Sequence, residues 1–173
     1  MNMYFTGGTE DYLKKIIEKH RNETLLLMQN EDIFLLAHET EGSSVFNEPK
    51  KYEIIDSSGS LTATTGFAGC NHIPVSDEGR PLFEYRFKNR ARSIEKEPGF
   101  IAIRVLRPLR YDTYMVFTLW KDEKAYHQWK KSKSFSEAHA KGEFDKKQNP
   151  IIFPRPSFVT NYKIYEEKEE KNN

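Results

Sequence analysis

The sequence predicts an α+β fold made of two ferredoxin-like units within one chain. Short apolar segments with the length and alternation of β-strands recur along the 173 residues, separated by a few amphipathic helical segments. Their order is βαβββ in the first half and βαββααβ in the second. A repeated split βαβ order of this kind is typical of ferredoxin-like units with helices on one face of a sheet.

The first unit is predicted from three apolar segments and one helical segment. Met3–Phe5 predicts a strand, and Thr9 is the candidate N-cap of a helix that ends near His20. Leu25–Met28 and Ile33–Ala37 predict a hairpin, because the Asn and Asp residues between them tolerate turn conformations.

A polar stretch of small residues separates the two halves. Tyr52–Ile55 predicts the last strand of the first unit, and Ser57–Ser60 and Thr62–Gly66 follow it. Domain boundaries commonly fall in stretches of this composition. We therefore expect an N-terminal ferredoxin-like half domain over residues 1–60 and a second domain over residues 66–165.

The second unit begins with a predicted strand at Phe67–Val75, and a helix is expected from about Glu78 to Ser93. Phe100–Leu106 and Thr113–Trp120 predict two further strands. The helix is expected to bury an apolar stripe formed by Leu82, Phe83, Phe87, Ala91 and Ile94. Alternation along the last strand places on one face Tyr114, Val116, Thr118 and Trp120.

Two short helices are predicted after these strands. Asp122 is the candidate cap of the first, which runs to about Lys131. Ser134 and Glu137 have the spacing of a capping box, so the second helix should open there and end near Gly142.

The break between these helices matters for Trp129 and His139. On one unbroken helix the two residues, ten positions apart, would be rotated by roughly 280° and would occupy different faces. On two consecutive helices, an indole and an imidazole can converge on one cavity.

The remaining segments complete the second unit. Ser157–Tyr165 predicts the last strand, and the charged stretch 143–149 is expected to form a loop. The polar tail 166–173 is expected to be disordered.

Charge and cysteine content exclude several classes of partner. Lys and Arg total 27 against 26 for Asp and Glu, which gives a net charge of +1 and no long-range field toward nucleic acid or an anionic membrane. Cys70 is the only cysteine, so an intramolecular disulfide is excluded. With no signal-peptide pattern and no apolar run of membrane-spanning length, we expect a soluble, cytoplasmic protein.

The common hydrolase and nucleotide-binding motifs are also missing from the sequence. No two of the five histidines pair at the i, i+4 spacing with the acidic partner that zinc hydrolases use. A Gly-rich phosphate loop and a serine nucleophile elbow are both absent from the sequence.

The segment from Trp120 to His139 instead resembles that of the haem-degrading members of the antibiotic-biosynthesis-monooxygenase family. The matching positions are Trp120, Lys121, Ala125, Tyr126, Trp129, Ser132, Phe135, Ala138 and His139. The stretches 66–75, 78–91 and 97–109 resemble the same family. The likeness to the two-domain HmoB type runs from the N-terminus to about Tyr165, and that to the wider IsdG-like family covers about Phe67–Tyr165.

This resemblance implies a fold and an activity. Members of the family pair two ferredoxin-like units into a dimeric α+β barrel, so here the N-terminal half would replace the second subunit and make a pseudo-dimer within one chain. The implied activity is that of a haem oxygenase. The enzyme binds haem as both substrate and cofactor, takes electrons from an external donor or reductase, and uses O2 to open the porphyrin to a bilin-type product with release of iron.

The resemblance also implies a role for three residues. His139 matches the proximal ligand of the haem iron, and Trp129 matches the tryptophan that presses on the porphyrin and can distort it. Asn71 matches the distal asparagine, whose amide can donate a hydrogen bond beside the iron. Each also has a plain structural interpretation: a helix-terminal histidine, a core tryptophan and a strand-end asparagine.

Several neighbouring residues have less specific interpretations. His72 departs from the family pattern, but strand alternation should point it away from the face of Asn71. Cys70 is interpreted as a buried structural thiol. Candidate cations for the haem propionates are Arg86, Lys88, Arg90 and Arg92, and these would serve equally well on a solvated helix face. Candidate pocket or core aromatics are Phe67, Phe87, Trp120 and Phe135.

Two other functions remain open from the sequence. The protein could bind haem for storage or transfer without degrading it, or it could be a cofactor-free monooxygenase of the same superfamily acting on an aromatic metabolite. We expect either a monomer, as the pseudo-dimer, or a weak homodimer.

Overall fold

The computed structural model describes residues 1–140 and 151–167, except for the side chains of residues 137–140. Its strands are β1 (Asn2–Gly8), β2 (Thr24–Gln29), β3 (Phe34–Thr40), β4 (Lys50–Gly59), β5 (Phe67–Pro74), β6 (Phe100–Pro108), β7 (Thr113–Trp120) and β8 (Phe158–Ile164). Its helices are α1 (Glu10–Lys19), α2 (Arg80–Lys88), the 3₁₀ helix η1 (Ser93–Lys96), α3 (Glu123–Lys130) and α4 (Lys133–Ala140).

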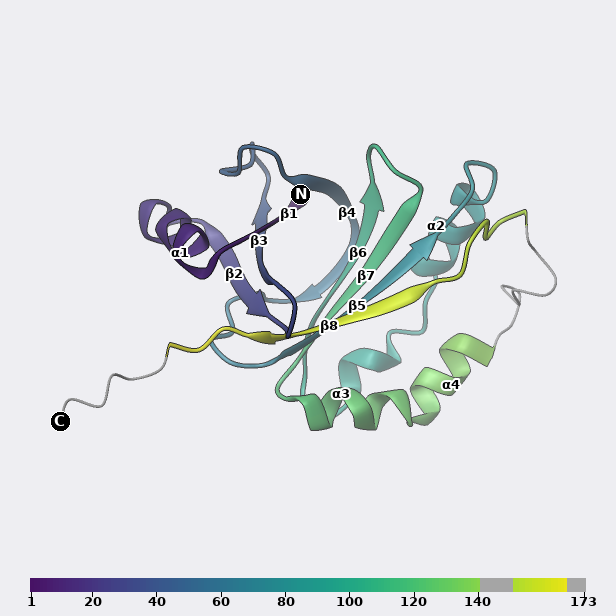
Figure 1. Cartoon of the computed structure of the whole chain (residues 1–173). Coiled ribbons are helices and arrows are strands. Elements are labelled where there is room, and N and C mark those ends of the chain that lie inside the picture. Colours follow the sequence, from purple (N-terminus) through teal and green to yellow (C-terminus); the bar gives the residue numbers. More distant parts are fainter. Residues whose placement is uncertain (141–150, 168–173) are drawn as a thin grey trace.

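The strands form a closed antiparallel barrel in the order β1-β3-β2-β8-β5-β7-β6-β4 (Figure 1). Within it, the first half contributes β4-β1-β3-β2 and the second half β8-β5-β7-β6. Both halves thus have the strand order 4-1-3-2 of a ferredoxin-like unit. The last strand of each half pairs with the second strand of the other, as β4 with β6 and β8 with β2. The predicted two-unit fold is confirmed, and the sheet edges are removed by mutual pairing.

The barrel interior is the main hydrophobic core. Alternate residues of each strand point inward, as Met3 and Phe5 do on β1 and Phe117 and Leu119 do on β7. The opposite residues of the same strands face the helices. On β7 these outward residues include Tyr114 and Trp120, as the alternation predicted.

The two halves differ in what covers their outer faces (Figure 1). In the first half, α1 packs on the sheet through Leu13, and Phe46, from the segment between β3 and β4, joins the same cluster. In the second half, the corresponding connection between β7 and β8 contains α3 and α4. The second half is therefore the one in which a site could lie between the sheet and two helices.

Several predicted turns and caps are confirmed. Thr9 accepts a hydrogen bond from the backbone N–H of Tyr12, and Asp122 accepts one from that of Ala125. In the β2–β3 turn, the Asn30 side-chain oxygen accepts hydrogen bonds from two backbone N–H groups. These local contacts fix where α1 and α3 begin and how the hairpin closes.

Two predicted element boundaries were wrong. Ser57, expected in a linker, lies in β4, which runs to Gly59 and pairs with β6. The long helix expected to Ser93 ends at Lys88, because the chain turns there and Arg92 adopts a left-handed conformation with φ of 54°.

The apolar stripe predicted for that helix was therefore only partly correct. Phe83 is buried and Phe87 packs against it, but Leu82 is 43% exposed. Ala91 lies beyond the helix and is exposed, and Ile94 packs with α3 from η1 instead.

The capping box at Ser134 was also wrong. Ser132 caps α4, because its hydroxyl accepts a hydrogen bond from the backbone N–H of Phe135. The predicted helix end near Gly142, the loop 143–149 and most of the predicted tail lie outside the described residues. Within the described part of the chain, none of the helices is long and apolar enough to span a membrane.

Candidate functional site

Asn71 points outward from the middle of β5. Its neighbour Cys70 belongs to the barrel core, so alternation turns the Asn71 side chain toward the helical layer. The Asn71 side-chain oxygen is buried, yet no described residue donates a hydrogen bond to it. A buried amide oxygen without a donor costs about 1–3 kcal/mol, so such a group in a strand interior calls for an explanation.

Trp129 lies on the same side of the sheet and is held there by a chain of contacts. Its indole is stacked on Trp120 of β7, with ring centroids 5.1 Å apart. The Trp120 Nε1–H donates to the Thr118 hydroxyl at 2.9 Å, and that hydroxyl donates to the Gly69 carbonyl at 3.3 Å. The platform under Trp129 is thus fixed by polar contacts to the two central strands.

Close approach of α3 to the sheet depends on Gly69. A Cβ atom at this position would lie 2.5 Å from the ring of Tyr126, which is far below any normal contact. Tyr126 also packs on Phe67, with ring centroids 5.2 Å apart. The sequence therefore places a glycine where the first helix of the pair comes closest to β5.

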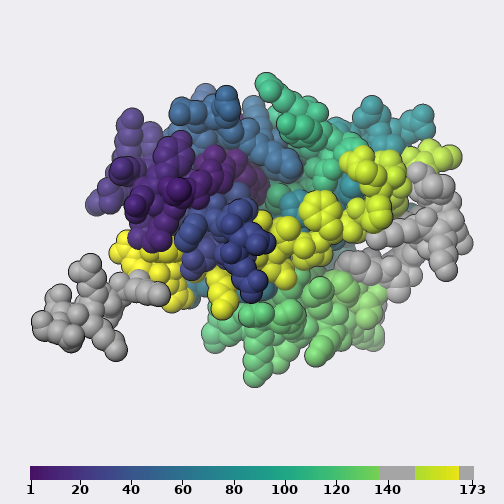
Figure 2. All heavy atoms as spheres, viewed as in Figure 1, coloured from purple at the N-terminus to yellow at the C-terminus, as the bar shows by residue number. Residues whose placement is uncertain are grey.

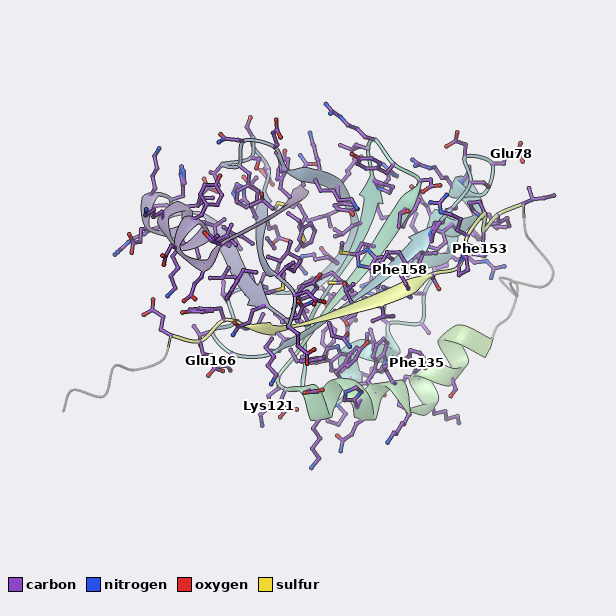
Figure 3. The ribbon with its side chains drawn as sticks, in the orientation of Figure 1. Glu78, Lys121, Phe135, Phe153, Phe158 and Glu166 are labelled. Atoms are coloured by element: carbon purple, nitrogen blue, oxygen red, sulfur yellow. The ribbon has the colours of Figure 1, made fainter. Side chains whose placement is uncertain are left out.

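The helix α4 also packs over this face of the sheet. The rings of Phe135 and Trp129 are perpendicular, with centroids 5.0 Å apart, and Ser134 donates a hydrogen bond to Glu97 at 2.7 Å. Figure 3 places Phe135 between α4 and the sheet. His139 belongs to α4, as the two-helix prediction required, but its side chain lies outside the described residues.

The other end of the face is closed by α2. Phe83 packs on Tyr114 with ring centroids 4.7 Å apart, and Glu84 accepts hydrogen bonds from Arg107 and from the Tyr114 hydroxyl. The Arg107 guanidinium holds the pKa of Glu84 below its usual value.

Asn71 lies between these two helical clusters. The α3 cluster packs over Phe67 and Trp120, at one end of β5 and β7, and the α2 cluster packs over Ile73 and Tyr114, at the other end. Val116, which pairs with Asn71, belongs to neither cluster and is only partly buried. Among the described residues, neither helical cluster therefore packs over the position of Asn71.

The cations proposed for the rim of this site are not equally available. Arg90 is engaged with Asp56 at 2.7 Å and Glu95 at 2.6 Å. Arg92 is half exposed and makes only longer contacts, at 3.5 Å, to the same two carboxylates. Lys88 is exposed at the end of α2.

The aromatic residues assigned to the pocket or core all contribute to the two clusters. Trp120 and Phe67 are buried, Phe135 contacts Trp129, and Phe87 contacts Phe83 at 4.9 Å. Among the residues described, no three His, Cys, Asp or Glu side chains are grouped as a metal site.

His72 and Cys70 face the barrel interior, opposite to Asn71. The His72 Nε2 atom lies 2.9 Å from the Thr160 hydroxyl, and its ring stacks on Phe158 at 4.5 Å. Figure 3 shows Phe158 on the opposite side of β8 from Phe135. Burial raises the pKa of the Cys70 thiol to about 12, which agrees with a structural role.

The buried position of His72 makes stability depend on pH. Desolvation, together with the nearby Lys50 charge, lowers the pKa of His72 from 6.5 to about 4. In the folded protein His72 is therefore neutral down to about pH 4, whereas in the unfolded chain it takes up a proton near pH 6.5. We expect the free energy of unfolding to fall by about 1–2 kcal/mol between pH 6.5 and pH 4, because the unfolded state binds more protons there.

Urea unfolding at pH 7 and pH 4.5 tests this expectation. His72→Gln should remove part of the pH dependence, and His20→Gln, at the residue that follows α1, serves as the control. An equal effect of His72→Gln at both pH values would contradict it.

No role in the site was assigned from the sequence to three residues of this face: Gly69, Tyr126 and Asn161. Asn161 lies on β8 opposite Gly69, and its side-chain oxygen is also buried without a donor among the described residues. Asn is disfavoured in strand interiors, so an Asn in an outward position of a predicted strand was the available signal.

The fold and this face together define a class. The protein is a two-unit α+β barrel in a single chain, and the helix-covered outer face of its second half carries a buried carboxamide and a stacked tryptophan. Residues 70–141 match the model of the antibiotic biosynthesis monooxygenase family.

Two kinds of curated relative are similar to this chain. A heme-degrading monooxygenase of Listeria monocytogenes is 27% identical over 130 residues, which cover 75% of this chain and 77% of that protein. The signal transduction protein TRAP of Staphylococcus epidermidis is also 27% identical, over 141 residues that cover 82% of this chain and 84% of that protein.

Known structures share the whole architecture. A monooxygenase-like protein from Listeria innocua superposes with a TM-score of 0.76 at 26% identity, over 96% of this chain and 95% of that one. A major regulator of staphylococcal pathogenesis superposes with a TM-score of 0.81 at 23% identity, over 97% and 100% of the two chains, which shows a common fold.

Proposed function

We propose that the protein is a haem-degrading monooxygenase of the HmoB type, which binds haem on the outer face of the second unit and opens the porphyrin oxidatively. In this proposal residues 66–165 form the haem monooxygenase domain, and residues 1–60 form the half domain that completes the barrel. An external electron donor and O2 are required, iron and a bilin-type product are released, and the reaction takes place in the cytoplasm.

The observation that carries the proposal is the buried, unpartnered oxygen of Asn71 on the face that α3 and α4 cover. Two independent features support it. Trp129 and His139 lie on consecutive helices, as the proposed arrangement needs. The relative from Listeria monocytogenes named heme-degrading monooxygenase matches three quarters of the chain.

The residues present fit a haem group. His139 would bind the iron, Trp129 would pack against the macrocycle from its position on Trp120, and Asn71 would face the group from β5. When bound, haem supplies the redox chemistry with O2. Asn71 has a role of its own, because its carboxamide can donate a hydrogen bond and hold a polar ligand in a fixed orientation in a dry site.

A second candidate function is haem binding without turnover. A role without catalysis is favoured by the relatives named signal transduction protein TRAP, which match more of the chain at the same identity than the heme-degrading relative does. In this case the same face would hold haem as a stable ligand.

Haem titration followed by turnover tests the proposal. The wild-type protein should bind haem with a Soret shift. His139→Ala should weaken binding by at least about 100-fold, because even loss of an outer partner of a metal ligand costs about 10–100-fold. His127→Ala, a histidine exposed on α3, is the matched control and should bind normally.

Addition of ascorbate in air then separates the two functions. Loss of the Soret band with release of ferrous iron supports the monooxygenase, and a stable band supports haem binding alone. Equal haem affinity of wild type and His139→Ala would overturn the assigned ligand and favour a cofactor-free monooxygenase.

A further inference from the structure

Two buried carboxamides lie next to each other on the outer face of the second unit. Cys70, Thr160 and Tyr162 point into the barrel, so alternation directs Asn71 on β5 and Asn161 on β8 outward. The registers Asn71↔Val159 and Gly69↔Asn161 make the two asparagines diagonal neighbours. Diagonal neighbours across an antiparallel pair lie about 7–8 Å apart, within reach of one small ligand.

The two side chains share an unusual feature. Each has a buried amide oxygen to which no described residue donates a hydrogen bond. Asparagine is poorly suited to strand interiors, and a buried acceptor without a donor is unfavourable. An apolar residue would pack better and would favour strand formation more. Neither packing nor strand formation therefore explains why asparagine occupies both positions.

Asn161 lies where the helical layer approaches the strands. It is opposite Gly69, the residue over which the Tyr126 ring of α3 packs. Figure 2 shows β8 (yellow) directly beside the atoms of α3 and α4 (green) on this side of the molecule. The same helix that carries Trp129 therefore covers the sheet beside Asn161.

The backbone of β8 is fixed at this position. The Asn161 carbonyl accepts a hydrogen bond from the Asn30 side chain at 3.2 Å, which ties β8 to the β2–β3 turn. The strand also pairs with β5 from Phe158 to Lys163. Because the backbone is held from both sides, the Asn161 carboxamide is presented at a defined place beside Asn71.

We propose that Asn161 is a second ligand-binding residue of this face, and that the N–H groups of its carboxamide act with those of Asn71 to donate hydrogen bonds to a small polar ligand bound here together with haem. The inference rests on the proposed haem site. In this inference, the polar groups of the site come from a pair of residues on two neighbouring strands.

Ligand binding to the ferric haem complex tests the pair, with cyanide as the probe. Asn161→Leu keeps the approximate shape of the side chain but removes its hydrogen bonds, and should weaken cyanide binding by about tenfold. Asn161→Asp keeps the shape and adds a negative charge, and should weaken it further. Lys163→Ala, at the next outward and exposed position of β8, is the matched control and should leave cyanide affinity unchanged.

The outcomes separate the two proposals. If the wild type binds haem and Asn161→Leu and Asn161→Asp bind cyanide as tightly as it does, the role of Asn161 is overturned while the haem site stands. If the wild type does not bind haem, the proposed function fails and the inference fails with it. Thermal unfolding of the haem-free variants checks folding, and Asn161→Leu should be at least as stable as the wild type.

Discussion

Asn71→Leu is expected to reduce haem turnover by about 100-fold while the affinity for haem changes only a few-fold. Removal of a single hydrogen-bond donor that acts in a water-excluded site commonly costs 10²–10³ in kcat. Haem affinity should depend mainly on His139 and on apolar contacts with the helical layer. The measurement is the initial rate of Soret loss with ascorbate, together with a haem titration of the same preparation.

The same variant should have the opposite effect on stability. Leucine removes the buried acceptor of Asn71 and suits a strand better, so the haem-free protein should gain about 1 kcal/mol in free energy of unfolding. A protein that keeps a destabilising polar group at its active site shows the usual trade-off between stability and activity. Val159→Leu, on the strand position that pairs with Asn71, is the control. Unchanged turnover in Asn71→Leu would remove Asn71 from the mechanism.

The order of strands and helices could be predicted because each element carries its own local signal. The turn residue Asn30 and the cap residues Thr9 and Asp122 act within a few positions, and the structure uses all three. The alternation on β7 also gave the outward face correctly. Each of these signals depends only on residues that are close together in the sequence.

The errors arose where distant contacts decide the local structure. Ser57 and Gly59 have the composition of a linker, but β6 supplies backbone hydrogen-bond partners that extend β4 through them. The apolar pattern beyond Lys88 suggested more helix, whereas Arg90 is held by Asp56 of β4 and Ile94 by the α3 cluster. None of these partners is near in sequence.

The candidate site shows the same difference between residues that local signals identify and residues that only long-range contacts identify. Asn71, Trp129 and His139 could be assigned because they match positions of the family that the sequence resembles. Alternation then placed Asn71 and His72 on opposite faces of the strand. Asn161 could not be found in this way, because its place beside Asn71 follows from the register of β8 against β5. The pairing partner of the last strand is set only when the barrel closes.

Closure of the barrel brings a charged pair from the two halves into the interior. Arg104 of β6 is only 4% exposed and forms an ion pair with Glu39 of β3. The Arg104 guanidinium also donates to the carbonyl groups of Ser58 and Gly59, at 2.9 and 2.8 Å. The pair therefore joins strands of both ferredoxin-like units at the end of the barrel where β4 finishes.

Glu39→Ala is expected to lower the free energy of unfolding by about 3–5 kcal/mol, because it leaves the Arg104 charge buried without its counter-ion. Carbonyl acceptors satisfy N–H groups but do not balance a full charge. The double variant Glu39→Leu with Arg104→Leu should recover most of the loss, since apolar side chains can replace a buried ion pair at little cost. Urea unfolding measures both changes, and Glu41→Ala, an exposed glutamate two residues away, is the control. If Glu39→Ala and Glu41→Ala were equally stable, the two halves would be held together by strand pairing and core packing alone.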